Sequence, residues 1–385
     1  MYKYKCLNPI AAIGLDGFTS NYTKVAEDEA ADIILVRSAK MHEMEFEPEL
    51  KCIARAGAGV NNIPLDRCAE QGIVVFNTPG ANANGVKELF VFAAIASLRD
   101  VIGGIGWTAS EAGNPDIAAL TEKEKKRFVG HEITGKKLGV IGLGAIGAKV
   151  ANVAVALGMK VTGFDAFLND AMKAALDPQV KIAANMDELV QDADMLTIHV
   201  PAMPATNGMI NADLLAKAKD GVVVINLARD TLVNEPDMAA ALESGKVAKY
   251  VCDFPTAGNT NMKNTILIPH LGASTEESED NCAVMAVEEI VDFMEYGNIR
   301  NSVNYPAAAL GTFVGSRTTV CHKASLDGVA LMNAIKDAGG IVDNMISKKR
   351  GDYAYSIFDV DNPEGIEEKL NNIDGVIKVR TLWHK

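Results

Sequence analysis

Residues 140–165 read VIGLGAIGAKVANVAVALGMKVTGFD: an apolar run, a glycine turn, an Ala/Val-rich stretch and a second apolar run that ends at Asp165. This order is typical of a strand, a helix and a second strand around a G-x-G-x-x-G turn. In such a turn Gly142 permits the tight bend, Gly144 leaves room for a pyrophosphate, and Gly147 lets the helix pack closely on the strand. The helix N-terminus offers free N–H groups to phosphates. Asp165, 18 residues after Gly147, is placed to accept hydrogen bonds from an adenosine ribose and would repel a 2′-phosphate, so the stretch predicts NAD rather than NADP.

Short apolar runs recur along the chain and alternate with helix-like segments. This alternation predicts βαβ units around parallel sheets covered on both faces. Residues 86–106 predict one long Ala-rich helix that ends in a glycine-rich stretch, and residues 110–137 a polar, solvated connection. The predicted strands cover residues 33–36, 73–76, 138–142, 160–164, 195–200, 222–228, 250–254 and 265–270.

The pattern changes after residue 301. The segment NSVNYPAAALG (301–311) contains Pro and Gly and predicts a linker. Beyond it, strand-like and helix-like runs follow in the order β-α-β-β-α-β. A module of about 70 residues with this order is typical of a ferredoxin-like sandwich.

The composition indicates a globular chain with more than one domain. Of the 385 residues, 48% are hydrophobic and 23% are charged, and 50 acidic residues against 37 basic ones give a net charge of −13. This charge disfavours binding to nucleic acid or to an anionic membrane. The six cysteines form no CxxC pair, which favours reduced core residues over a metal site or disulfides. With no signal-peptide-like or membrane-spanning apolar run, we expect a cytoplasmic protein.

Several motifs occur in the order found in one enzyme family: RAGAGVNNI (55–63), FNTPGANANGVKEL (76–89), GLGAIG (142–147), HVPAMPATNGMI (199–210), NLARDTLVN (226–234) and PHLGAST (269–275). On these motifs the chain resembles the D-isomer-specific 2-hydroxyacid dehydrogenases, most closely the phosphoglycerate dehydrogenase branch with a C-terminal ACT-type domain. The resemblance covers nearly the whole chain. It implies an α/β protein in which a Rossmann-type NAD-binding domain is inserted in a flavodoxin-like substrate domain, with the active site between them and a ferredoxin-like ACT domain at the end. The implied ranges are 87–272 for the NAD domain, 1–86 and 273–300 for the substrate domain, 301–315 for the linker and 316–385 for the ACT-like domain.

Two residues at the carboxyl ends of predicted strands resemble the family's catalytic pair. His270 corresponds to the acid/base, because an imidazole can both accept and donate a proton near neutral pH. Arg229 corresponds to the substrate arginine, whose planar fork suits a carboxylate. Open α/β sheets bind their ligands at these strand ends.

The resemblance also implies two sets of binding residues. The predicted cofactor residues are Gly142, Gly144, Ala145, Ile146, Gly147, Asp165, His199, Val200, Pro201, Thr206, Asn226, Leu227, Ala228, Asp253 and Gly272. A phosphorylated substrate needs further positive charge, and the predicted substrate residues are Arg37, Ser38, Lys40, Arg55, Ala58 and Gly59. Lys87 is either a further ligand or a surface residue. No metal site is predicted.

One departure from the family concerns the partner of His270. Relatives carry a glutamate a few residues beyond the strand that ends near Asp253, whereas this chain has Ala257 there. A neighbouring carboxylate favours the protonated imidazole. Its absence should therefore penalise reduction of a keto acid more than oxidation of a hydroxy acid, unless Glu276 or Glu277 takes its place.

The C-terminal module implies assembly, and in relatives also serine binding. His322 and Gly328 of the usual pattern are present, but Ala324 stands where an amide side chain commonly contacts the amino acid, which favours assembly as a homodimer or homotetramer over feedback by an effector. We expect NAD-dependent oxidation of D-3-phosphoglycerate, the first step of L-serine biosynthesis. Two alternatives stay open: another 2-hydroxy or 2-oxo acid (2-hydroxyglutarate, glyoxylate or hydroxypyruvate), or a non-catalytic NAD-sensing protein.

Overall fold

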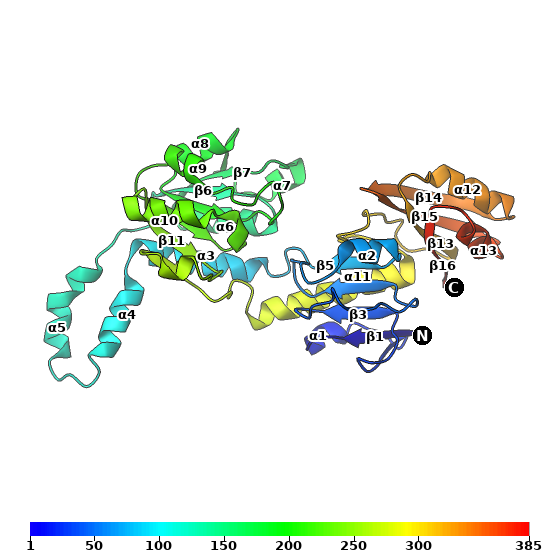
Figure 1. Cartoon of the computed structure of the whole chain (residues 1–385), viewed down its shortest axis with the longest axis horizontal. Coiled ribbons are helices and arrows are strands. Elements are labelled where there is room, and N and C mark those ends of the chain that lie inside the picture. Colours follow the sequence, from blue (N-terminus) through cyan, green and yellow to red (C-terminus); the bar gives the residue numbers. More distant parts are fainter. Residues whose placement is uncertain (385) are drawn as a thin grey trace. The chain divides into compact units, whose positions relative to one another are not determined.

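A computed structural model describes residues 1–384 and divides the chain into two compact units. Unit 1 comprises Met1–Asn82 and Glu276–Lys385, and unit 2 comprises Ala83–Thr275. Each unit has its own parallel sheet, and unit 1 has in addition an antiparallel sheet near its C-terminus (Figure 1). The predicted fold class is confirmed.

Unit 2 contains a seven-stranded sheet in the order β12-β11-β10-β9-β6-β7-β8, with every neighbouring pair parallel. The chain starts at β6, builds outward to β8, returns to β9 beside β6 and then builds outward to β12. The order therefore reverses between β6 and β9, where doubly wound sheets bind their ligands. The strands are β6 (Lys137–Ile141), β7 (Lys160–Phe164), β8 (Lys181–Ile182), β9 (Met195–Ile198), β10 (Val222–Asn226), β11 (Val247–Cys252) and β12 (Thr265–Leu267).

Helices cover both faces of this sheet. On one face, apolar residues of α3 and α6, such as Phe90 and Val150, pack on Val140. On the other face, α8, α9 and α10 pack on Leu196 and Val224. The helices of unit 2 are α3 (Ala83–Leu98), α4 (Val101–Ser110), α5 (Ile117–Glu124), α6 (Ala145–Ala156), α7 (Asp170–Ala174), α8 (Met186–Gln191), α9 (Ala212–Lys217) and α10 (Glu235–Ser244), with short 3₁₀ turns at Lys125–Phe128, Asp230–Leu232 and Asn259–Asn261.

The single helix predicted over residues 86–106 is wrong. The structure has two helices, α3 and α4, bent by 75°. The Asp100 side chain accepts a hydrogen bond from Gly103 N at 3.1 Å and so begins a new helix, and the glycines lie inside α4 instead of ending it. The predicted polar connection is partly helical, because it contains α5. Figure 1 shows α4 and α5 as a pair that extends away from the sheet of unit 2.

No single helix within residues 1–384 has both the length and the hydropathy needed to cross a bilayer. The bent pair of α3 and α4 meets that test only when the two helices are taken together.

Unit 1 begins with a five-stranded parallel sheet in the order β2-β1-β3-β4-β5. This is the flavodoxin-like order, so the flavodoxin-like prediction is confirmed. The long helix α11 packs on it, with Ala286, Ile290 and Phe293 sharing a core with Leu35 and Ala54. The elements are β1 (Tyr2–Cys6), α1 (Ala12–Leu15), β2 (Tyr22–Lys24), β3 (Ile33–Val36), β4 (Cys52–Arg55), α2 (Leu65–Glu70), β5 (Val74–Asn77) and α11 (Glu276–Tyr296).

The C-terminal part of unit 1 has the predicted β-α-β-β-α-β order, and its four strands form an antiparallel sheet in the order β14-β15-β13-β16. One face of this sheet packs on α12 and α13, with Leu331 and Phe358 in the core. The other face contributes Cys321, Tyr355 and Ile357 to the core shared with α11. The elements are β13 (Gly315–Lys323), α12 (Gly328–Asp337), β14 (Ile341–Arg350), β15 (Tyr353–Asp361), α13 (Ile366–Asn371) and β16 (Val376–His384).

The segment before this sheet, predicted as a linker, is packed against the parallel sheet. Tyr305 is buried, and its hydroxyl donates to Ala69 O at 2.7 Å. The Asn304 side chain accepts from Val75 N at 2.9 Å and donates to Ile73 O at 2.8 Å, as a neighbouring strand would. The connection is therefore part of the core of unit 1.

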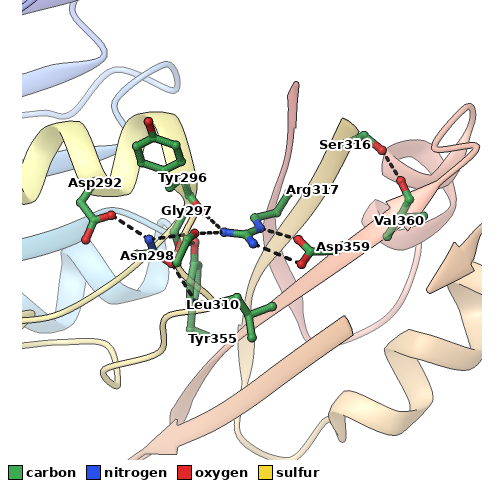
Figure 2. A network of polar contacts seen from close by, with 11 residues as sticks. Asp292, Tyr296, Gly297, Asn298, Leu310, Ser316, Arg317, Tyr355, Asp359 and Val360 are labelled. Carbon is green, nitrogen blue, oxygen red and sulfur yellow. Dashed lines mark hydrogen bonds and ion pairs between the residues drawn. The ribbon is translucent and has the colours of Figure 1, made fainter. Parts of the chain in front are cut away.

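Arg317 joins the C-terminal sheet to the end of α11 (Figure 2). This fully buried guanidinium contacts the Asp359 carboxylate at 2.6 and 3.2 Å and donates to the carbonyls of Tyr296 and Gly311, each at 2.7 Å. The Tyr355 hydroxyl donates to Gly297 O at 2.8 Å. The donors to Tyr296 O and Gly297 O satisfy carbonyls that the C-terminus of α11 leaves free.

Candidate active site

The glycine turn follows β6 and leads into α6. Gly142 has a φ of 90°, and a Cβ there would lie 2.7 Å from His199 O, so both conformation and space require glycine. A Cβ on Gly147 would collide with Gly142 O, so only a glycine at this position allows the helix to pack against the turn. A Cβ on Gly144 would meet nothing within 4 Å. Space is therefore open above the turn, where Ala145 and Ile146 begin α6 and present backbone N–H groups.

Asp165 follows β7 and faces the glycine turn. One carboxylate oxygen accepts from Leu143 N and the other from Phe167 N, both at 2.8 Å. Each oxygen keeps a lone pair for another donor. The carboxylate is thus fixed beside the open space above Gly144, as a ribose-binding residue requires.

The loop after β9 carries four of the predicted cofactor residues. Burial lowers the pKa of His199 to about 3, so its imidazole is neutral. Its Nε2 lies 2.9 Å from Thr197 Oγ1, and within residues 1–384 its buried Nδ1 has no hydrogen-bond partner. Thr206 Oγ1 donates to Pro201 O at 2.6 Å and accepts from Met203 N at 2.9 Å, which fixes the loop after Val200.

Arg229 is positioned by the turn that follows β10. Asn226 is buried; its side chain accepts from Ala228 N at 3.1 Å and donates to Arg229 O at 2.7 Å, and Leu227 is buried beneath the turn. The Arg229 side chain donates to Ala228 O at 2.6 Å. Burial lowers the pKa of the guanidinium, although arginine keeps its charge in proteins.

Asp253 organises the loop that carries His270. This side chain is 1% exposed, and its carboxylate accepts from the backbone N–H groups of Leu271 and Gly272, both at 2.8 Å. Its backbone carbonyl accepts from His270 N at 3.0 Å. Burial raises the pKa of Asp253. His270 itself has a φ of 57°, an uncommon conformation that these contacts hold in place.

The structure brings Arg229 and His270 together on one aromatic ring. The centroid of the His270 ring lies 4.8 Å from that of Phe254, and the Arg229 guanidinium carbon lies 5.7 Å from the same Phe254 centroid. The His270 ring is exposed, so a substrate can reach it. Sequence reasoning missed Phe254, although its place directly after Asp253 at a strand end could have singled it out.

The loop that contains Ala257 does contact a carboxylate, but this carboxylate belongs to Glu235 and not to residue 257. Glu235, at the start of α10, accepts a hydrogen bond from Thr256 Oγ1 at 2.5 Å. Within unit 2, the His270 ring itself makes no hydrogen bond or ion pair. Glu276 and Glu277 begin α11 and belong to unit 1.

The predicted substrate residues cluster in unit 1 at the carboxyl ends of β3 and β4. Arg55 Nε donates to Arg37 O at 3.0 Å, and the Arg55 guanidinium covers Gly57, where a Cβ would collide with it. Arg37 forms an ion pair with Glu279 of α11 at 2.5 Å. Ala58 O accepts from Asn77 Nδ2 at 2.6 Å and Gly59 follows it, while Ser38 and Lys40 are exposed.

Lys87, which the sequence leaves as either ligand or surface residue, contacts its helix neighbours. Its Nζ donates to Asn84 Oδ1 at 2.6 Å and lies 3.7 Å from the Glu88 carboxylate.

The open glycine turn, the Asp165 carboxylate beside it and the reversal of strand order are typical of a dinucleotide-binding α/β protein. Residues 95–272 match the family model described as D-isomer specific 2-hydroxyacid dehydrogenase, NAD binding domain. A putative D-3-phosphoglycerate dehydrogenase of Schizosaccharomyces pombe is 31% identical over 355 residues, which cover 84% of this chain and 72% of that protein. The chain belongs to the D-isomer-specific 2-hydroxyacid dehydrogenase family, and the prediction of NAD as cofactor is confirmed.

Two further relatives give the extent of the similarity. The D-3-phosphoglycerate dehydrogenase of Bacillus subtilis is 34% identical over 332 residues, which cover 80% of this chain but 60% of that protein. The crystal structure of NAD⁺-bound 3-phosphoglycerate dehydrogenase from Entamoeba histolytica aligns with a TM-score of 0.63 and 26% identity, covering 79% of this chain and 98% of that one. The chain thus spans about three-fifths of the Bacillus subtilis relative.

Proposed function

We propose that the protein oxidises D-3-phosphoglycerate to 3-phosphohydroxypyruvate with NAD, as the first step of L-serine biosynthesis. The observation that carries the proposal is the packing of His270 and Arg229 on Phe254, beside the loop that Asp253 ties down. A proton acceptor and a carboxylate-binding cation are the two groups that oxidation of a 2-hydroxy acid requires.

In the proposed reaction C2 loses a hydride, the hydroxyl loses a proton, and a carbonyl forms. We assign the proton to a ring nitrogen of neutral His270, which returns it in the reverse direction. NAD, when bound, supplies the nicotinamide that takes the hydride. We assign the substrate carboxylate to Arg229, whose guanidinium also stabilises charge on the oxygen at C2. Phe254 orients both side chains through its ring.

We assign the phosphate to the cluster of Arg37, Ser38, Lys40 and Arg55, because a phosphate carries up to two charges and prefers arginine forks. A second candidate keeps the chemistry with an unphosphorylated 2-hydroxy or 2-oxo acid. The observation that favours it is the ion pair between Arg37 and Glu279, which a phosphate would have to displace.

We further propose that the protein forms a homodimer or homotetramer. Apolar side chains along α3 and α4 are exposed: Phe92, Ile95, Val101, Ile102 and Ile105. Contiguous exposed apolar surface is typical of protein interfaces. The C-terminal sheet is the proposed ACT-like domain, and it would bind an amino-acid effector near His322 and Gly328. We place the protein in the cytoplasm, because all six cysteines are free thiols.

The test is a steady-state assay of the full chain with NAD and a panel of 2-hydroxy acids, for the parent, His270→Ala and the control His131→Ala at an exposed histidine. We expect 3-phosphoglycerate to give the highest kcat/KM. His270→Ala should lose a factor of about 10² to 10⁴ in turnover, with NADH binding retained in a fluorescence titration, whereas His131→Ala should match the parent. A parent that binds NADH and oxidises none of the acids would refute the proposal in favour of NAD sensing.

A further inference from the structure

Asn8 holds the loop that carries the proposed phosphate residues. Its side-chain oxygen accepts hydrogen bonds from three consecutive backbone N–H groups, those of Arg37 and Ser38 at 2.9 Å and of Ala39 at 3.0 Å. Its Nδ2 lies 3.5 Å from Ser38 Oγ. One side chain from the loop after β1 therefore fixes the backbone that follows β3.

Asn8 lies at the edge of the parallel sheet of unit 1 where the strand order reverses. In the order β2-β1-β3-β4-β5 the chain moves from β1 to β2 on one side and then to β3 on the other. The carboxyl ends of β1 and β3 thus border the point where the strand order reverses, and open α/β sheets bind ligands there. Asn8 lies two residues beyond the end of β1, and Arg37 directly follows β3.

Three N–H groups that converge on one oxygen are an arrangement that usually holds an anion. A carboxylate at position 8 would accept the same three bonds, and charged acceptors form stronger ones. Loop stability alone would therefore favour aspartate. An amide oxygen at this position accepts the same three hydrogen bonds as a carboxylate oxygen would, and it adds no negative charge beside Arg37.

We propose that Asn8 is a specificity-determining residue, which orders residues 37–39 as an aspartate would while keeping the site receptive to a doubly charged anion. The inference rests on the proposed function, because it takes the phosphate to bind at this loop. A charge at position 8 repels a phosphate dianion about twice as strongly as a monoanion. The logarithm of the affinity loss should scale in the same way.

The decisive variant is Asn8→Asp, because it can retain the three acceptor bonds while it adds a negative charge; its one other change replaces the long contact from Nδ2 to Ser38 Oγ by an oxygen that can accept from that hydroxyl. The matched control is Asn21→Asp, which adds the same charge at an exposed asparagine of the same unit. We expect Asn8→Asp to raise KM for 3-phosphoglycerate roughly tenfold or more at low salt and less at high salt. The KM for unphosphorylated D-glycerate should rise by no more than about threefold, with kcat kept and the melting temperature equal to or above that of the parent. Asn21→Asp should behave as the parent.

A third variant separates charge from structure. Asn8→Ala removes the acceptor without adding charge, so it should lower the melting temperature and weaken the binding of 3-phosphoglycerate by a factor, relative to the parent, that does not grow at low salt as the factor for Asn8→Asp does. Equal losses of both substrates in Asn8→Asp, or no loss in either, would overturn the inference.

Isothermal titration with inorganic phosphate separates this inference from the proposed function. If the parent oxidises no 3-phosphoglycerate, the proposed function fails. A phosphate affinity that falls at least about tenfold in Asn8→Asp but not in Asn21→Asp would still support the role of Asn8, whereas an unchanged phosphate affinity would overturn it.

Discussion

The carboxyl group of Glu289 should make unit 1 less stable as the pH rises. Glu289 lies on α11 and is 6% exposed. Its Oε1 accepts from Asn301 Nδ2 at 2.5 Å, while Oε2 is buried and has no hydrogen-bond partner within residues 1–384. Burial, with a smaller contribution from nearby Glu288, raises the pKa of Glu289 from 4.5 to about 8; the bond from Asn301 and the charge of Arg300 oppose this shift.

The sign and size of the effect follow from linkage. Between pH 4.5 and about 8 the folded state keeps the proton that the unfolded chain has lost. Raising the pH through this window therefore removes stability, at about 1.4 kcal/mol for each pH unit. The window spans roughly 3.5 units, so the total loss is at most about 5 kcal/mol; it is smaller where water can reach Oε2.

Glu289→Gln should abolish this dependence, because an amide cannot ionise. Hydrogen exchange of the α11 amides, followed by mass spectrometry, reports on unit 1 alone, whereas one melting temperature would mix two units. Comparing variant with parent at the same pH cancels the intrinsic exchange rate.

At pH 5 we expect similar protection in both proteins, and at pH 8 exchange at least about tenfold slower in Glu289→Gln, which corresponds to about 1.4 kcal/mol or more. Glu288→Gln, at the exposed neighbouring glutamate, removes only the smaller contribution to the raised pKa of Glu289, so it should show a much weaker trend than Glu289→Gln. A ratio of variant to parent protection that stays constant from pH 5 to pH 8 would refute the reasoning.

Three further outcomes are expected. Asp165→Ser should narrow the preference for NAD over NADP, measured as the ratio of kcat/KM values, because the carboxylate that repels a 2′-phosphate is removed; equal use of both cofactors by the parent would contradict this. Ala257→Glu should increase keto-acid reduction at neutral pH relative to oxidation, because a carboxylate beside His270 favours the protonated imidazole; an unchanged pH profile in both directions would show that position 257 does not face His270. Arg317→Met should destabilise unit 1 by about 3 to 5 kcal/mol, because it leaves the Asp359 carboxylate without its ion-pair partner, and adding Asp359→Leu should recover part of the loss; hydrogen exchange of β13 and α11 measures both, and full stability in the single variant would argue against a structural role of the pair.

The parts of the fold set by local patterns could be predicted from the sequence. Strands 33–36 and 160–164 have the predicted bounds, because a short run of residues typical of strands, fully buried in the first and alternately buried in the second, is a local feature. The glycine turn is also local, since Gly142 and Gly147 meet within one bend. Both parallel sheets and the β-α-β-β-α-β order follow from the same kind of pattern.

Features that depend on a contact between distant residues could not be predicted. The pairs Arg37–Glu279 and Tyr305–Ala69 are each separated by more than 200 positions. The break between α3 and α4 is local, but the apolar pattern continues through it, so only the capping bond of Asp100 marks the boundary. His270 and Arg229 were singled out from the sequence, and the structure brings both side chains onto the ring of Phe254. Phe254, and Asn8, which holds the backbone of residues 37–39, stand outside any periodic pattern.

The contact between the C-terminal sheet and α11 limits how such a chain can be recombined. A domain on a free tether can be exchanged for another by joining sequences at the tether. Here an incoming domain would have to supply a buried cation for the carbonyls of Tyr296 and Gly311, and a hydroxyl for Gly297. It would also have to match the apolar surface that Phe293 offers. The C-terminal sheet, this helix and the N-terminal parallel sheet on which the helix packs must therefore be inherited together. Exchange between relatives should preserve the chain when Met1–Asn82 and the segment from Glu276 onward come from the same parent, and disrupt it when a junction lies after Tyr296.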